Sequence, residues 1–405
     1  MSGDRETMMK RSAMHFSSKP LTAVTVLLLS CVLTTAEWSS SLEAIQTKYH
    51  LPGLAAARIG IHHHENITAH AVGIRKMGDT SPLSTLDKFH LGSLTKAMTA
   101  TLIAILIDDG INDLSWNTTV PEALPHLNIP LAHQNTTLMM LASHRAGLND
   151  TSFLLSEQPL WLSLANQTYT PIEGRGLVAE RAFAYTLATP PGEAFLYSNL
   201  GYMILGHLLD MYHPSGGWED YIQRKLWNPL GMTECGFGPV PQGQNGEPLN
   251  PWPHLPGQNG TGPIPVPWET DNPPTLGPAG TVHCSISSYA RFLLLHLSTM
   301  LGFRSCLLPR EAFRALHTPY RLLAGAPKVG GIGDAYTPGG WVLEDGGPAL
   351  KNYLLHDGSN TVNYAVALVV PEKGEAFFIG TNVGNAATAT NEVAAGLLSA
   401  SLELV

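Results

Sequence analysis

Three short motifs hold residue types that can do nucleophilic chemistry together. In chain order they are Ser93-x-x-Lys96, Tyr197-x-Asn199 and His356-x-Gly358. A serine hydroxyl becomes a nucleophile when a neighbouring group takes its proton, and lysine and tyrosine are the bases that these motifs offer. The first two patterns occur once each in the chain. Because Ser-x-x-Lys is a weak signal on its own, its local context decides what it means.

The residues around Ser93 predict a buried helix that begins at the serine. Residues 97–107 form a strongly helix-forming and almost entirely apolar run, which Gly110 ends. We expect Ser93 to be the N-cap, with Lys96 on the same face of the helix three residues later. Burial and the positive helix end both favour a neutral amine at Lys96, which can accept a proton. The alternative is an ordinary capping serine beside a solvated lysine.

Several segments in matching order resemble the serine β-lactamase and penicillin-binding-protein superfamily. The resemblance is greatest to its class C β-lactamase branch, which also holds esterases, D-aminopeptidases and DD-peptidases. It extends from about residue 41 to the C-terminus. The segments are residues 89–114, 141–148, 191–202, 229–238 and 278–292, followed by Gly340-Trp341 and the His-x-Gly motif.

This resemblance implies a role for each residue of the first two motifs. Ser93 would be the acyl-accepting nucleophile, Lys96 would share its proton, and Tyr197 would be the base that later activates water. Asn199 would hold a carbonyl group of the substrate. The backbone N–H groups of Ser93 and Ser359 would form the oxyanion hole, where such donors stabilise a tetrahedral intermediate by a few kcal/mol each.

The third motif follows a predicted strand. Residues 351–355, 363–370 and 375–381 are expected to be three strands, the first of which would end at His356 on an edge facing the cleft. Gly358, having no Cβ, would let the substrate backbone approach. By resemblance His356 belongs to the substrate site, at the position where β-lactamases proper have lysine. The alternative is a turn histidine and glycine without a role.

The chain between the motifs predicts an α/β architecture of the α+β kind. We expect an antiparallel sheet built from residues 37–95 and 276–405, flanked by helices, with a mostly helical insert at about 111–275. Twelve of the thirty prolines fall in residues 239–278, which predicts a long loop over one rim of the cleft. Further expected elements are a helix at 39–50, a hairpin of 54–62 and 68–75, and a final helix at 386–402.

Composition bounds the class of protein. A chain of 405 residues with 44% hydrophobic and 14% charged residues can bury a large core, so residues 37–405 are expected to form one elaborate domain. The net charge is −9, and without residues 1–36 it becomes 19 − 30 = −11. Such an acidic chain argues against a nucleic-acid partner.

The N-terminus has the pattern of a secretory signal. Four basic residues precede an apolar run at 21–33, and Thr34-Thr35-Ala36 follows as a small-residue cleavage site. Residues 1–36 are therefore predicted to be a signal peptide, with an uncleaved membrane anchor as the alternative. Six Asn-x-Ser/Thr sequons follow the run and predict an extracellular glycoprotein: Asn66, Asn117, Asn135, Asn149, Asn166 and Asn259.

Cysteine and histidine say less. Cys31 would leave with the signal, and the remaining three cysteines permit one disulfide or none. Cys284 and Cys306 bracket a helical run and are the favoured pair, with Cys235 left over. His62-His63-His64 predicts no metal site, because adjacent strand residues point to opposite faces. No cofactor is expected.

These observations predict a secreted serine hydrolase that forms an acyl-enzyme on an ester, amide or lactam. Its partner would be a small-molecule or peptide substrate, with membrane contact if the N-terminal segment stays attached. Histidine in place of lysine at 356 weakens the cationic grip on a β-lactam carboxylate, which favours esterase or peptidase work over antibiotic resistance. Two alternatives remain open: a non-catalytic binding protein of the same fold, and an acyltransferase that uses the same residues.

Overall fold

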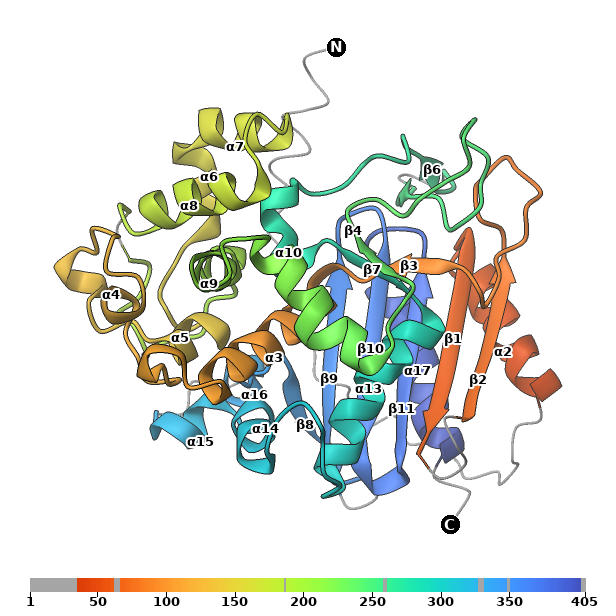
Figure 1. Cartoon of the computed structure of the whole chain (residues 1–405). Helices are drawn as coiled ribbons and strands as arrows, with labels where there is room; N and C mark the ends of the chain where they lie inside the picture. Colours follow the sequence, from red (N-terminus) through yellow and green to blue (C-terminus); the bar gives the residue numbers. More distant parts are fainter. Residues whose placement is uncertain are drawn as a thin grey trace.

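A six-stranded antiparallel sheet joins the two ends of the chain in a computed structural model that describes residues 35–61, 66–185, 187–257, 261–326, 331–347 and 350–401. The strand order is β2-β1-β11-β10-β9-β8 (Figure 1). The strands are β1 (Gly53–Gly60), β2 (Asn66–Gly73), β8 (Val342–Asp345), β9 (Asn352–Ser359), β10 (Tyr364–Val370) and β11 (Glu375–Thr381). The expected architecture and the N-terminal hairpin are confirmed, and residues 62–65, between the two hairpin strands, lie outside the described residues.

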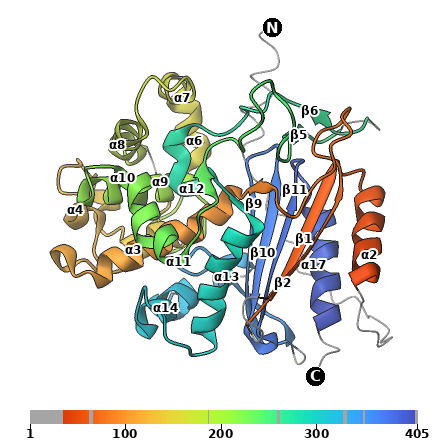
Figure 2. The same ribbon diagram turned by 45° about the vertical axis from the view of Figure 1, so that its right-hand side comes forward.

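The central strands are apolar on both faces because helices cover both. In β10, Val366 and Leu368 pack into one core, whereas Ala365 and Ala367 pack into the other. The first face is covered by α2 (Thr35–Lys48) and α17 (Ala387–Ser401), and the second by α13 (Ile286–Met300). Figure 2 shows the sheet between helices α2 and α17 on one side and α13 on the other.

A mostly helical region lies beside the second face of the sheet (Figure 1). Its centre is α3 (Thr95–Asp108), against which α9 (Asn199–Tyr212) packs. The other helices before the last strands are α4 (Val120–Ala123), α5 (Leu138–Ala142), α6 (Asp150–Ser156), α7 (Gln158–Ala165), α8 (Pro171–Ala182), α10 (Gly217–Ile222), α11 (Asn228–Leu230), α12 (Gly277–Gly280), α14 (Arg310–His317), α15 (Tyr320–Ala324) and α16 (Ile332–Ala335). Within the described part of the chain, none of the helices has the length and apolar character that a membrane crossing requires.

Two small sheets border the helical region. Strands β3 (Lys88–His90), β7 (Val282–Ser285) and β4 (Cys235–Phe237) pair in the order β3-β7-β4 just before the Ser93 turn. The proline-rich segment, expected to lack regular structure, contains one short ladder between β5 (His254–Leu255) and β6 (Ile264–Pro265). The segment also contains the 3-10 helix η5 (Pro274–Leu276) and runs into α12, so it is less irregular than expected, and its place over one rim of the cleft stays a prediction.

The disulfide joins Cys235 to Cys284, so the predicted Cys284–Cys306 pair is wrong. Cys235 and Cys284 lie directly opposite each other on β4 and β7. Cys306 is a free, exposed thiol beyond the end of α13. A helix of 15 residues is about 22 Å long, whereas bridged cysteines have Cα atoms within about 7 Å. The helical run thus separates the two cysteines that were expected to pair.

Candidate active site

Ser93 lies in a tight turn between the small sheet and α3. The turn is the 3-10 helix η1 (Gly92–Leu94), which runs directly into α3. The expectation that Ser93 caps the helix is wrong, because the N-cap is Leu94 and it makes no side-chain capping bond. The Ser93 hydroxyl instead meets Lys96, whose Nζ lies 3.0 Å from Ser93 Oγ. The expected burial of the helix is confirmed from Thr95 to Leu106.

Lys96 is fully buried and has three oxygen partners. Besides Ser93 Oγ, its Nζ contacts Asn199 Oδ1 at 2.8 Å and the Ala279 carbonyl oxygen at 2.7 Å. Burial lowers the pKa of Lys96 to about 7, although the charge of Asp150 opposes that shift. The amide and peptide oxygens can only accept, so each takes one N–H. The remaining position of the nitrogen faces Ser93: it is a third N–H in the ammonium and a lone pair in the neutral amine.

Tyr197 and Asn199 flank the start of α9. Ser198 is the N-cap, and its side chain accepts from the Gly201 N–H. Asp150, at the start of α6, accepts from Ser198 Oγ at 2.5 Å and from the Asn199 backbone N–H at 2.6 Å. The Asn199 side-chain oxygen is thus occupied by Lys96, which leaves its amide N–H₂ as the group to hold a substrate carbonyl.

The Tyr197 phenol packs between the reacting groups and a histidine ring. Burial raises its pKa well above 10, a shift that a hydrogen bond with Ser93 reduces. Lys96 Nζ lies 4.8 Å from the centre of the Tyr197 ring, and the His144 ring lies 4.1 Å away on centroids. At rest Tyr197 is therefore a neutral phenol.

His356 is the end of a hydrogen-bonded chain that begins at Ser198. The Ser198 N–H lies 3.0 Å from His144 Nδ1, and Tyr336 Oη is 3.1 Å from both His144 Nε2 and His356 Nε2. Burial lowers the pKa of His144 well below its usual range and that of His356 to about 3, so both rings are neutral. Since His144 Nδ1 accepts, we assign its proton to Nε2, and Tyr336 then donates to His356. The remaining His356 nitrogen, Nδ1, is buried, and a hydrogen bond to the Asp357 backbone partly offsets the effect of burial on the pKa of the ring.

A glycine is needed at position 358 for a different reason from the one expected. The expectation that the strand ends at His356 is wrong, because β9 continues through Gly358 to Ser359, past the residues that pair with β8. That the motif faces a cleft stays a prediction. A Cβ on Gly358 would stand 2.7 Å from the Ser93 nitrogen, and one on Gly92 would stand 2.4 Å from the Ser359 nitrogen. The glycine therefore admits the protein's own Ser93 turn, and the two backbone segments predicted to form the oxyanion hole are in contact.

Sequence reasoning missed Asp150, Tyr336 and the role of His144. His144 lies in a segment that carried the family resemblance, but Asp150 and Tyr336 belong to no recognised motif. The predicted sequon residues Asn117, Asn135 and Asn166 are exposed and Asn149 is half-buried, while Asn259 and the Asn66 side chain lie outside the description. Among the described residues no group of three or more histidine, cysteine or acidic side chains could hold a metal ion, and His62 to His64 fall outside them.

The fold, with a serine, a lysine and a tyrosine brought to one place, defines a hydrolase of the serine β-lactamase type. The family model described as Beta-lactamase matches residues 38–400, so the chain belongs to that family. Penicillin-binding protein 4 of Amycolatopsis lactamdurans is 26% identical over 366 residues, which cover 86% of this chain and 85% of that protein. An unguisins hydrolase of Aspergillus campestris is 26% identical over 252 residues, 60% of this chain but only 44% of that hydrolase.

Solved structures show the same fold. The octameric penicillin-binding protein homologue from Pyrococcus abyssi superposes with a TM-score of 0.69 at 18% identity, covering 89% of this chain and 77% of that one. D-amino acid amidase from Ochrobactrum anthropi gives a TM-score of 0.68 at 18% identity, covering 91% and 98%. At these identities the likeness concerns the fold.

Proposed function

We propose that the protein hydrolyses uncharged esters or amides through an acyl-enzyme on Ser93. The surroundings of Lys96 support this most strongly. Two oxygens, of Asn199 and Ala279, each accept an N–H of Lys96, so the lone pair of the neutral amine faces Ser93 Oγ. With a pKa of about 7, about half of the molecules hold a neutral amine at pH 7. In that state Lys96 takes the proton of Ser93 as the hydroxyl attacks the substrate carbonyl.

The other groups complete the two half-reactions. The backbone N–H groups of Ser93 and Ser359 would hold the oxyanion of the tetrahedral intermediate. When the intermediate collapses, the leaving alcohol or amine needs a proton, and the Tyr197 phenol passes on the one that Lys96 has taken. Water then enters, gives up a proton through Tyr197 to Lys96, and attacks the acyl group. The second tetrahedral intermediate collapses by breaking its bond to Ser93 Oγ, which takes the proton back from Lys96, and the carboxylic acid is released.

Neutral His356 supports an uncharged substrate. A ring with a pKa of about 3 carries no charge at pH 7, so it cannot pair with a substrate carboxylate as an ammonium would. One similar protein is named as a hydrolase, and the name of a structural neighbour, D-amino acid amidase, points to amide bonds.

We also propose that the enzyme works outside the cytosol. The basic and apolar N-terminal pattern and three exposed sequons support export. The Cys235–Cys284 disulfide adds independent support, because such bonds persist in oxidising compartments. Fractionation of expressing cells and their medium, with glycosidase treatment of the recovered protein, tests this; protein confined to the cytosol, with a mass that the glycosidase leaves unchanged, would contradict it.

The test of the activity is intact-mass analysis after exposure to p-nitrophenyl butyrate and, separately, to benzylpenicillin. The wild type should turn over the ester, and Ser93→Ala should abolish both turnover and any adduct. Ser156→Ala, an exposed serine at the end of α6, is the matched control and should behave as the wild type. Wild-type protein without turnover or adduct would refute the proposal. Ester transfer to an added alcohol in preference to water would assign an acyltransferase instead.

A further inference from the structure

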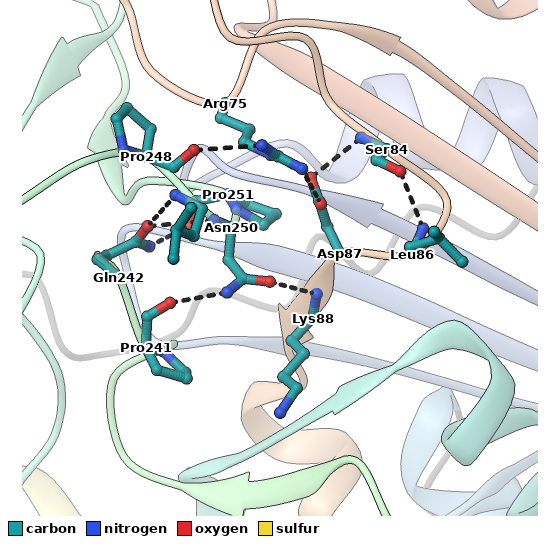
Figure 3. A network of polar contacts seen from close by, with 11 residues as sticks. Arg75, Ser84, Leu86, Asp87, Lys88, Pro241, Gln242, Pro248, Asn250 and Pro251 are labelled. Carbon is teal, nitrogen blue, oxygen red and sulfur yellow. Dashed lines mark hydrogen bonds and ion pairs between the residues drawn. The ribbon is translucent and has the colours of Figure 1, made fainter. Parts of the chain in front are cut away.

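The proline-rich segment is fastened to the strand that leads to Ser93. Figure 3 shows the first attachment, in which the Asn250 side-chain oxygen accepts from the Lys88 backbone N–H at 2.9 Å. Beside it Arg75 pairs with Asp87 at 2.6 Å and donates to the Pro248 carbonyl oxygen at 3.3 Å. These hydrogen bonds hold this part of the segment against β3.

The second attachment is Asp271, whose carboxylate accepts from the Asn272 backbone N–H at 2.7 Å and also contacts two side chains outside its own segment. Its Oδ2 lies 2.9 Å from His90 Nε2, and its Oδ1 accepts from Asn360 Nδ2 at 3.0 Å. His90 Nδ1 in turn accepts from the Gly92 backbone N–H at 3.1 Å, so its proton lies on Nε2 and is donated to Asp271. The side chains of His90 and Asp271 are 1% and 2% exposed, and Asn360 is 5% exposed. Buried charge-assisted bonds of this kind are among the stronger ones in proteins.

The two side-chain partners of Asp271 belong to the two halves of the proposed oxyanion hole. His90 holds the N–H of Gly92, the residue before Ser93, whereas Asn360 directly follows Ser359. Asn360 also orders its own loop, because its side-chain oxygen accepts from the Asn363 backbone N–H at 2.9 Å. One carboxylate therefore bridges the segments that carry both N–H donors.

We propose that Asp271 is a positioning residue that sets the separation and direction of the oxyanion-hole donors on Ser93 and Ser359. The proline-rich segment thereby contributes to catalysis. This inference rests on the proposed acyl-enzyme function. A misplacement of about 1 Å in an active site can cost about a hundredfold in rate, so the bridge has a measurable effect although it touches no reacting atom.

The experiment compares Asp271→Ala and Asp271→Asn with Glu269→Gln, an exposed acidic residue of the same segment. Full-length secreted proteins are assayed with a p-nitrophenyl ester, and a boronic acid reports the affinity for a tetrahedral adduct. Asp271→Ala should lower kcat about 10- to 100-fold with KM little changed, and should weaken boronate binding by a similar factor. Asp271→Asn keeps the shape but places an N–H₂ donor against one or more of the donors that the carboxylate accepts from, so a smaller loss of the same kind is expected.

Asn360→Ala removes the hydrogen bond between Asn360 and Asp271, and it tests the bridge while leaving Asp271 itself unchanged. Its loss in kcat should not add to that of Asp271→Ala in the double variant, because the two residues act through one bridge. If the Asp271 and Asn360 variants fold, bind the boronate and turn over the ester as Glu269→Gln does, the inference is overturned. Loss of thermal stability with unchanged kcat would likewise overturn it, by showing a merely structural role. Failure of the proposed function is distinct, because the wild type itself would then lack ester turnover.

Discussion

The pH dependence of kcat/KM tests the role of Lys96 directly. With a pKa of about 7 for Lys96, the neutral fraction is about one half at pH 7, about one tenth at pH 6 and about one hundredth at pH 5. Because attack by Ser93 needs the neutral amine, kcat/KM for an uncharged ester should fall about tenfold per pH unit below pH 7 and level off above about pH 8. His356, with a pKa of about 3, and Tyr197, with a pKa well above 10, cannot produce this limb.

Asp150→Asn is the perturbation that identifies the titrating group. The Asp150 charge raises the pKa of Lys96, so its removal should move the limb to lower pH. The asparagine oxygen can still accept from the Asn199 N–H, which keeps the start of α9 in place. Initial rates from pH 5 to 9, with thermal unfolding at each pH, measure both effects. A flat profile, a limb that moves upward in Asp150→Asn, or a limb that disappears in His356→Asn would refute the assignment.

Two further predictions concern the supports of the site. Tyr336→Phe removes the hydroxyl between the buried His144 and His356 rings, so the free energy of unfolding should fall by about 2 kcal/mol and kcat by about tenfold. Thermal melts and ester kinetics measure the two effects. An unchanged kcat would show that the Tyr336 hydroxyl does not orient His356. Cys284→Ser opens a loop spanning 49 residues and should cost about 4 kcal/mol, whereas Cys306→Ser at an exposed site should cost less than about 0.5 kcal/mol. Denaturant unfolding compares the two, and the reverse order would contradict the Cys235–Cys284 pairing.

How much of the site the sequence predicts depends on how local each relation is. Ser93 and Lys96 are predictable because one helical turn sets their separation, and the apolar run after them predicts the burial that lowers the pKa of Lys96. The strands of the sheet are predictable from their apolar runs, since helices cover both faces. Asp150 and Tyr336 are not predictable in this way. Each is a single polar residue without a repeating pattern, and its partners come from distant parts of the chain.

The errors have the same origin. Pairing Cys284 with Cys306 used closeness in sequence, but a helix carries the chain away and the true partner is opposite on the neighbouring strand. The expectation for Gly358 was right that a small residue is needed there, but it named substrate as the neighbouring group. The space beside Gly358 is filled instead by the turn that holds Ser93.

The neutral rings of His144 and His356 make it easier for Lys96 to take up a proton. Lys96 lowers the pKa values of His144 and His356, and by the same interaction a charged ring at either place would oppose protonation of Lys96. Burial keeps both rings neutral, so the proton taken from Ser93 adds a charge to the lysine without meeting another cation. Asp150 then favours the ammonium that forms after attack. A lysine at position 356 would place a second ammonium beside Lys96 and make that proton transfer harder. Histidine at 356 therefore serves the base as well as the choice of an uncharged substrate.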